Sequence, residues 1–332
     1  MRHAFLAQVL ALAAAAIAAG TGAAAGEKSP MALVRTIALP GVKGRIDHMS
    51  LDAEGKRLAI ACLGNGTVEV VDVEGGKVAG SIGRLREPQA ALVLPGTGRI
   101  VVTNGDDGTV RYYDGKTLEI ARTVELESDA DNARFDAASG LLYVGYGNGA
   151  VAVIGKGGRE ADLRLAGHPE SFQLEEKGKR IFVNVPTAKH VAVVDRAAGK
   201  VVATWPTGDA ASNFPMALAE GSHRLFVGCR SPARLLVYDT ASGKIVSTAD
   251  ISGDVDDIYV DTSGKRLYCS CGEGIVDVLD LSAADAWTRV AKVETAAGAR
   301  TSLYDPATGR LFVAVPARSL PQAELRVYST RP

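Results

Sequence analysis

The sequence predicts an all-β chain made of seven similar units, each with four short antiparallel strands. Residues 56–77 define the unit, because two strand-like runs, 58–62 and 67–73, flank Asn65 and Gly66, a dipeptide that readily adopts positive φ in a hairpin turn. The residues that open the second strand of each unit are Arg57, Arg99, Leu141, Arg180, Arg224, Arg266 and Arg310. Their spacings of 42, 42, 39, 44, 42 and 44 residues are typical of propeller blades, so we expect a seven-bladed β-propeller.

The four strands of each unit follow in order. The innermost strand is expected at runs such as 48–51 and 171–174, each followed by a turn rich in Asp, Gly, Lys and Ser. The hairpin supplies the second and third strands, and segments after Gly-Lys, such as 77–82 and 244–248, supply the outer strand. Large apolar residues alternate with small or polar ones, a pattern that fits sheets packed face to face.

The two ends of the chain are expected to share the last blade. The seventh unit contains only three strand-like segments, 301–304, 310–315 and 324–328, whereas residues 31–39 precede the first inner strand without a blade of their own. Pairing residues 31–39 with the last unit would leave no open sheet edge around the ring. Residues 26–332 are therefore predicted to form a single domain.

Residues 1–25 are predicted to be a cleaved secretory signal peptide. Arg2 and His3 precede an apolar run over residues 5–19, and residues 23–25 are small enough for a cleavage site. The run has about 15 residues, fewer than the ~20 needed to span a bilayer; an uncleaved anchor is the alternative. The alanine-rich composition is compatible with a bacterial source, so we expect a periplasmic or secreted protein with no later membrane span.

The charge of the chain argues against broad contact with nucleic acid. The sequence has 37 Lys and Arg against 38 Asp and Glu, and removal of residues 1–25 takes away Arg2 alone, so the net charge changes from -1 to -2. Nucleic-acid binding uses a strongly basic surface. The expected partner is a small polar molecule or another protein, and the protein is expected to be a monomer.

The units carry the pattern D-x-x-G-K-R-L-x-V, then N-G-x-V-x-V-x-D, then G-K-x-V, from about Leu33 to Tyr328. This pattern resembles the YVTN-repeat, YncE-like family of bacterial β-propellers. The resemblance implies a seven-bladed, mostly exported ring and assigns no catalytic residue. Blade 3 departs from the pattern because residues 153–155 lack the usual Asp, and blade 4 has Ala188 and Lys189 in place of Asn-Gly. The chain is more weakly similar to propeller lactonases, and it lacks the Trp-Asp signature of WD40 repeats.

Polar residues that differ from blade to blade gather where the inner strands are expected to start. The residues that lie ten positions before each aligned residue are expected to form a ring around the channel mouth: Asp47, Gln89, Asp131, Glu170, Phe214, Asp256 and Arg300. Two residues earlier, on the same face by strand alternation, it reads Arg45, Glu87, Asp129, His168, Ser212, Asp254 and Gly298. The predicted ligand-binding residues at this mouth are Arg45, Asp47, His48, Glu87, Gln89, Asp131, Asn132, Glu170, Asn213, Asp256, Asp257 and Arg300. The alternative is a set of solvated loop ends with turn-forming Asp.

Carboxylates that share a concavity repel one another, which raises some pKa values unless a cation compensates. Arg45 and Arg300 are candidate compensators. A divalent cation such as Ca²⁺ is the one candidate cofactor, because it prefers oxygen ligands. The residues that could supply them are Glu87, Asp131, Glu170 and Asp256.

Two histidines, His48 and His168, lie among these residues and are the candidates for a general base or a metal ligand. A histidine at a strand end is more often a structural hydrogen-bonding group. No nucleophile elbow, zinc-protease helix or phosphate-binding loop accompanies them.

The cysteines offer one candidate disulfide. Cys62, Cys229 and Cys271 end the second strand in blades 1, 5 and 6, and Cys269 lies two residues before Cys271. In an oxidising compartment Cys229 could pair with Cys271 or with Cys269. Bridging requires Cα atoms within about 7 Å, whereas packed sheets lie ~10 Å apart, so four buried free thiols are the simpler alternative.

The sequence leaves three functions open. The first is a non-catalytic exported protein that binds a small polar or cationic ligand at the acidic mouth. The second is a metal-assisted hydrolase of lactone type, in which a bound cation polarises a carbonyl and His48 or His168 moves a proton. The third is a protein-interaction scaffold that uses the outer loops.

Overall fold

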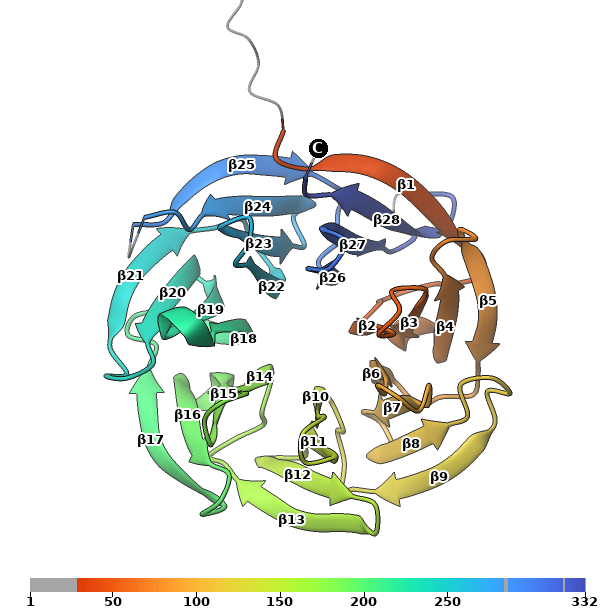
Figure 1. Cartoon of the computed structure of the whole chain (residues 1–332), viewed down its shortest axis with the longest axis horizontal. Helices are drawn as coiled ribbons and strands as arrows, with labels where there is room; N and C mark the ends of the chain where they lie inside the picture. The colour runs from red at the N-terminus through yellow and green to blue at the C-terminus, as the bar shows by residue number, and fades with distance from the viewer. Residues whose placement is uncertain (1–28, 284–285, 319, 332) are drawn as a thin grey trace, which may run out of the picture.

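The computed structural model describes residues 29–283, 286–318 and 320–331, so the predicted signal peptide lies outside the described residues. Seven antiparallel four-stranded sheets surround a central opening (Figure 1). Three short 3₁₀ turns are the only helical elements among the described residues: η1 (Leu63–Asn65), η2 (Pro186–Ala188) and η3 (Glu220–Ser222). The predicted seven-bladed β-propeller is confirmed.

Each blade runs from an inner strand at the opening to an outer strand at the rim. Blade 1 contains β2 (Met49–Leu51), β3 (Arg57–Cys62), β4 (Thr67–Asp72) and β5 (Lys77–Ile82). Blade 2 contains β6 (Pro88–Val93), β7 (Ile100–Asn104), β8 (Thr109–Tyr113) and β9 (Ile120–Glu125). Blade 3 contains β10 (Ala133–Asp136), β11 (Leu141–Tyr146), β12 (Ala150–Gly155) and β13 (Gly158–Arg164). Blade 4 contains β14 (Phe172–Leu174), β15 (Arg180–Val185), β16 (His190–Asp195) and β17 (Lys200–Pro206).

The remaining blades follow the same plan. Blade 5 contains β18 (Ala211–Ala219), β19 (Arg224–Ser231), β20 (Ala233–Asp239) and β21 (Ile245–Asp250). Blade 6 contains β22 (Val255–Asp261), β23 (Arg266–Cys271), β24 (Ile275–Asp280) and β25 (Thr288–Glu294). Blade 7 contains β26 (Ser302–Asp305), β27 (Arg310–Val315), β28 (Ala323–Ser329) and β1 (Ala32–Leu39). The second strand begins at the aligned residue in every blade except blade 2, where it begins one residue later, at Ile100.

The ring is closed by the N-terminal strand, as predicted. β1 pairs antiparallel with β28, with Ala32 opposite Ser329 and Leu39 opposite Ala323, and the two strands lie side by side at the rim in Figure 1. Ile37 and Leu39 of β1 are buried between blades 7 and 1. The first strand therefore both completes the last blade and fills the joint to the first.

The hairpin turn takes a different form from the one expected. η1 forms the turn of blade 1 and ends at Gly66, which has a φ of 65°. Lys189 adopts the same left-handed conformation after η2, the hairpin turn of blade 4, with a φ value of 52°. Blade 4 thus keeps the turn without the Asn-Gly sequence. Lys189 adopts a positive φ there, which is energetically unfavourable for a residue other than glycine.

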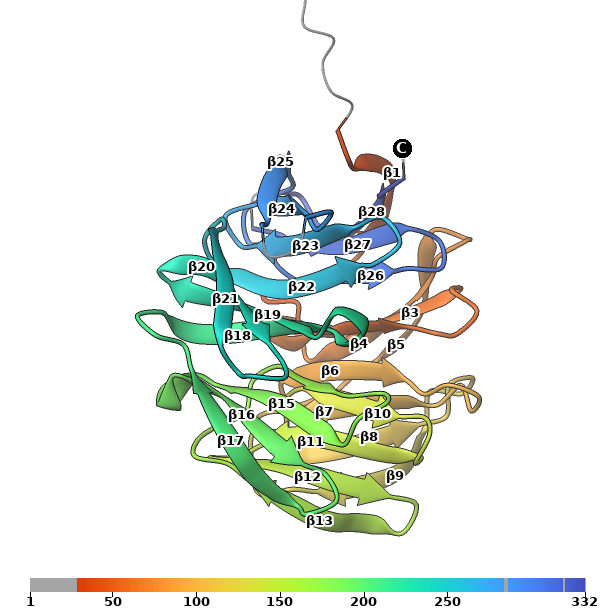
Figure 2. The same cartoon turned by 60° about the vertical axis from the view of Figure 1, so that its left-hand side comes forward.

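The core lies between the blades, which pack face to face around the ring (Figure 2). Seven clusters of buried apolar residues each join two neighbouring blades. Because this packing uses both faces of each sheet, the starts of the inner strands are left free to carry polar groups. Within the described residues, no helix is long and apolar enough to cross a membrane.

Candidate functional site

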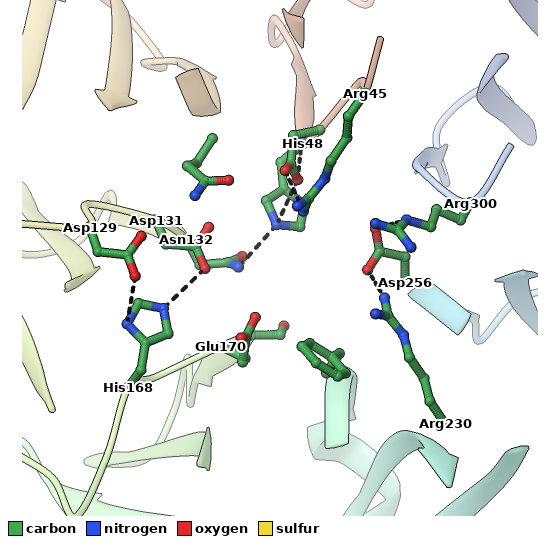
Figure 3. A pocket seen from close by; sticks show the side chains of 14 residues that line it. Arg45, His48, Asp129, Asp131, Asn132, His168, Glu170, Arg230, Asp256 and Arg300 are labelled. Atoms are coloured by element: carbon green, nitrogen blue, oxygen red, sulfur yellow. Dashed lines mark hydrogen bonds and ion pairs between the residues drawn. The ribbon is translucent and has the colours of Figure 1, made fainter. Parts of the chain in front are cut away.

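A cavity of about 180 Å³ lies at the mouth of the channel, where the inner strands begin (Figure 3). Its lining consists of Arg45, Asp47, His48, Gln89, Asp129, Asp131, Asn132, His168, Glu170, Ser171, Phe214, Arg230, Asp256 and Arg300. Ten of these fourteen residues are Asp, Glu, Arg or His. The cavity therefore suits a molecule held by charge and hydrogen bonds.

The backbone points the ring residues into the mouth in two ways. In blades 1, 3 and 4 the residue lies just before the inner strand, and the N–H groups of Asp47, Asp131 and Glu170 donate to carbonyls of the second strand at 2.7, 2.9 and 3.0 Å. In blades 2, 5 and 6 the inner strand has an irregular register at this point, and such bulges redirect a side chain. The residues at these irregularities are Gln89, Phe214 and Asp256.

Five of the seven positions two residues earlier depart from regular strand geometry. Glu87, Asp129, Ser212, Asp254 and Gly298 have positive φ values between 44° and 83°. The assumption of strand alternation is therefore wrong there, and the side chains point in different directions: Asp129 lines the cavity, whereas Glu87 is exposed outside the lining. Four of these five residues are not glycine, and they hold a costly conformation beside the cavity.

Two arginines and two aspartates form one side of the mouth. Arg300 Nη1 lies 2.7 Å from Asp254 Oδ1, and Arg300 Nε lies 3.1 Å from Asp256 Oδ2. Arg230 Nη2 donates to Asp256 Oδ1, and its guanidinium lies 4.0 Å from the centre of the Phe214 ring. Arg300 thus compensates carboxylates as predicted, and the charges on this side are balanced.

Arg45 and His48 lie at the top of Figure 3, and both contact Asp47. Arg45 Nη2 lies 2.6 Å from Asp47 Oδ2. Burial raises the pKa of Asp47 to about 6, although the positive charges of His48 and Arg45 act to lower it. Asn132 Nδ2 lies 3.0 Å from His48 Nε2, while His48 Nδ1 lies 4.0 Å from Asp257 Oδ1. Burial lowers the pKa of His48, but the carboxylates of Asp47 and Asp257 outweigh it, so the pKa is raised overall.

His168 is held by three oxygen atoms opposite the arginines. Its Nδ1 donates to the Gly147 carbonyl at 2.6 Å and lies 3.4 Å from Asp129 Oδ2, while its Nε2 lies 3.6 Å from Asp131 Oδ2. Burial lowers the pKa of His168, but its contacts with Asp131, Gly147 and Asp129 raise it to about 9. Burial likewise raises the pKa of Asp131, but His168 and His48 outweigh it, so that pKa is lowered. Near neutral pH His168 is therefore a cation.

The Glu170 carboxyl faces the middle of the cavity beside this group (Figure 3). No hydrogen bond or ion pair joins its side chain to any other described residue. Burial, followed by repulsion from Asp131, raises its pKa to about 7. Glu170 is thus a carboxyl whose negative charge has little compensation from the protein.

The structure brings nine of the twelve predicted ligand-binding residues to the lining: Arg45, Asp47, His48, Gln89, Asp131, Asn132, Glu170, Asp256 and Arg300. The other three lie elsewhere. Glu87 is exposed outside the lining. Asn213 is fully buried and donates from Nδ2 to Asn184 Oδ1 at 2.9 Å. Asp257 lies further along the channel, where its Oδ2 accepts the Ser302 N–H at 2.7 Å.

Arg230 and Ser171 line the cavity but were not predicted. Asp129 and Phe214 also line it; the sequence comparison placed them at the mouth but did not include them among the predicted ligand-binding residues. A signal for Arg230 exists in the sequence. Six residues after the aligned positions, the chain reads Leu63, Gly105, Gly147, Pro186, Arg230, Gly272 and Pro316. Arg230 is the charged residue in this series, so the comparison used at the inner strands would have found it at the end of the second strand.

The four predicted calcium ligands are spread over the mouth. Within residues 29–283, 286–318 and 320–331, no group of three or more His, Cys, Asp or Glu side chains is arranged to hold a metal ion. Asp131 and Glu170 share one side, Asp256 is bound by two arginines, and Glu87 lies outside the lining. The calcium site stays a prediction.

The predicted disulfide is not formed, and all four cysteines are free and buried. Cys229 packs with Phe182 in the cluster between blades 4 and 5. Cys269 and Cys271 pack with Phe226 in the cluster between blades 5 and 6. Cys229 therefore faces away from its proposed partners, because strand alternation directs it to the other side of blade 5.

Comparison with known proteins identifies the fold. No protein-family model and no curated protein sequence matches the chain. A chain of the mitotic checkpoint complex crystal structure is similar, with a TM-score of 0.75 and 16% identity over 97% of this chain and 98% of that chain. The likeness covers nearly the whole of both chains, so the two chains share the propeller fold. A chain of Kuenenia stuttgartiensis hydrazine synthase is also similar, with a TM-score of 0.73 and 18% identity over 83% of this chain and 95% of that chain. At such low identity the likeness concerns the fold alone.

Proposed function

We propose that the protein is an exported binding protein that holds a small, positively charged ligand at the mouth of its channel. The observation that carries this proposal is Glu170, whose carboxyl faces the cavity beside Asp131 without a partner among the described residues. An ammonium or guanidinium group would supply the missing positive charge. Charge-assisted hydrogen bonds of this kind are strong where water is partly excluded.

The distribution of charge favours one side of the cavity. Arg230 and Arg300 are already satisfied by Asp254 and Asp256. On the opposite side, His168 contacts the carboxylates of Asp129 and Asp131, and Glu170 has no such contact with a described residue. A ligand cation therefore gains most beside Glu170. With about 180 Å³ available, the cavity is smaller than the roughly 300–1,000 Å³ typical of sites for drug-sized ligands, so we expect a small metabolite.

The raised pKa of Glu170 gives binding a definite pH dependence. A cation binds the ionised carboxylate, and Glu170 becomes ionised as the pH rises through about 7. Affinity should therefore increase between pH 6 and pH 8 by about tenfold, and binding near pH 7 should release protons. Proton release can be measured by calorimetry in buffers with different ionisation enthalpies.

The binding proposal is tested by titrating guanidinium and methylammonium, with urea as a neutral analogue of guanidinium. Glu170→Gln keeps the shape of the side chain and removes its charge. We expect it to weaken cation binding by about tenfold or more, because a charged hydrogen bond contributes about 1.5–3 kcal/mol, and Asp131→Asn should also weaken binding. Glu87→Gln is the matched control, since it removes a nearby charge outside the lining. Equal affinity of all variants, or equal binding of urea, would contradict the proposal.

Export and family membership form part of the proposal. Their support is the Arg2-led apolar segment and the repeat pattern that resembles the YVTN-repeat, YncE-like propellers. N-terminal sequencing of protein recovered from a bacterial periplasm should find a start close to residue 26. A cytoplasmic protein that retains Met1 would overturn this part while leaving the cavity proposal intact.

The lactone-type hydrolase is the second candidate, and it would use the same cavity. One observation favours it: Glu170, with a pKa raised to about 7, lies near His168, with a pKa raised to about 9, and such pairs can divide acid and base roles. Lactone hydrolysis with added Ca²⁺ that is abolished in both Glu170→Gln and His168→Gln would replace the binding proposal. Hydrolysis that persists in both variants would point to a contaminant.

The scaffold hypothesis has support at the level of the fold. One similar solved structure is the mitotic checkpoint complex, an assembly of proteins. A scaffold would bind its partner through the outer loops, so a captured partner should bind the Glu170→Gln and wild-type proteins equally well. Loss of partner binding in this variant would place the partner at the mouth instead.

A further inference from the structure

A second cavity, of about 390 Å³, lies further along the channel below the mouth. Most of its lining is apolar or small and comes from the inner strands, for example Met49, Ala91, Ala217 and Leu303. His48 lines this cavity and also the mouth above it. The lining also contains one arginine, Arg134, and one carboxylate residue, Asp257.

Arg134 lies in β10 and lines this cavity without a carboxylate in direct contact with its guanidinium. Its Nη1 donates to the Ala133 carbonyl at 2.8 Å and to Asn132 Oδ1 at 3.3 Å, while its Nη2 donates to Ser171 Oγ at 3.4 Å. All three acceptors are neutral. No carboxylate of the described residues comes within 4.0 Å of the guanidinium. A guanidinium has five N–H donors, so part of its hydrogen-bonding capacity remains for a ligand.

A guanidinium without a direct ion-pair partner is costly in a channel, because burial removes water from the charge and no carboxylate replaces it. Arg230 and Arg300 at the mouth each form ion pairs with aspartates, whereas Arg134 forms none with a described residue. Asp257 and Asp131 act on the Arg134 charge only at longer range, and the guanidinium lies 5.5 Å from the centre of the Phe172 ring. The one carboxyl in the lining, Asp257, accepts the Ser302 N–H. Burial raises the pKa of Asp257 to about 7, so this group is partly neutral near pH 7.

We propose that the channel binds a small monovalent anion of the carboxylate class against Arg134. The planar guanidinium presents pairs of N–H groups that match a carboxylate, and the small side chains of Ala133 and Ala217 leave room for a ligand. The site uses residues other than Glu170 and does not depend on cation binding at the mouth. Its charge preference is opposite to that of the mouth.

The first test uses wild-type crystals soaked in sodium bromide, whose anomalous scattering locates the anion directly. We expect a peak beside the Arg134 guanidinium, at roughly 3.5 Å from a nitrogen. Peaks confined to surface lysines and arginines would overturn the proposal. This measurement needs no variant, so it stands even if substitution of Arg134 prevents folding.

The second test measures acetate binding by its effect on thermal unfolding at constant ionic strength. Arg134→Gln should weaken the apparent affinity by about tenfold or more, because the charged hydrogen bonds are lost, whereas Arg134→Lys should retain part of it. Arg99→Gln is the control, since Arg99 is exposed and does not line the cavity. Equal stabilisation of Arg134→Gln and wild type by acetate would show that the effect is a general salt effect and would overturn the proposal.

Discussion

Replacing Glu170 by Gln should stabilise the ligand-free protein above pH 7 while it weakens binding. In the folded protein the pKa of Glu170 rises from 4.5 to about 7. Each pKa unit corresponds to about 1.4 kcal/mol, so the ionised carboxylate costs the folded state up to about 3 kcal/mol. The Glu170 residue is partly exposed, so solvent screens the charge and this figure is an upper limit.

The sign of the effect follows from linkage. Because the folded pKa is raised, the folded state binds the proton more tightly than the unfolded state. Glu170 therefore costs nothing below about pH 4.5, its cost grows as the pH rises, and the full cost applies above about pH 7. Gln carries no charge at any pH, so the two proteins should have similar stability at pH 4.5 and differ most at pH 8.

The assay is urea unfolding of wild type and Glu170→Gln at pH 4.5, 6 and 8. We expect the free energy of unfolding of the variant to exceed that of wild type by about 1–3 kcal/mol at pH 8. A gain in stability combined with a loss of binding is typical of residues kept for function. A variant that is less stable than wild type at pH 8, or a difference that does not depend on pH, would refute the reasoning about Glu170.

Three further predictions follow from the fold and the site. Ile37→Ala in β1 should lower the free energy of unfolding by about 2–5 kcal/mol because Ile37 is buried at the closure, whereas Val34→Ala on the exposed side of β1 should change it by less than about 0.5 kcal/mol; similar urea midpoints for both would contradict the role of β1. The thiols should resist Ellman's reagent in the native protein and react after unfolding, because burial raises the pKa of Cys62 and Cys229 to about 12; fast native reaction would be inconsistent with the observed burial. An NMR titration should find His168 protonated until about pH 9, and its stabilising effect should be complete below its unfolded pKa and disappear as the pH rises through about 9; a midpoint near 6.5 would show that the carboxylate contacts are absent.

The sequence predicts the scaffold closely because the scaffold repeats. Arg57 and its six counterparts occupy equivalent places in the blades, and the closing strand could be inferred from a unit that lacked one strand. Each repeat adds an independent observation of the same local pattern. The turn after η2 shows the limit of this reasoning, since Lys189 adopts the left-handed conformation without glycine.

The candidate site could be located from the sequence but not described in detail. Comparison of equivalent positions identified Asp131, Glu170 and Asp256, but the strand alternation assumed for neighbouring positions fails at the turns before the inner strands. Side-chain pairing also depends on contacts between blades. Only the folded ring shows that Arg230 and Arg300 neutralise Asp256 while Glu170 keeps no partner among the described residues.

The most direct measurement is a high-resolution crystal structure of the mature protein grown at pH 8 with methylguanidinium. The account predicts density for the cation in the mouth cavity, with nitrogen atoms at roughly 3 Å from the carboxylate of Glu170. The same crystals of Glu170→Gln should lack this density. Cation density that lies elsewhere in the wild-type protein, or that persists unchanged in Glu170→Gln, would contradict the central claim.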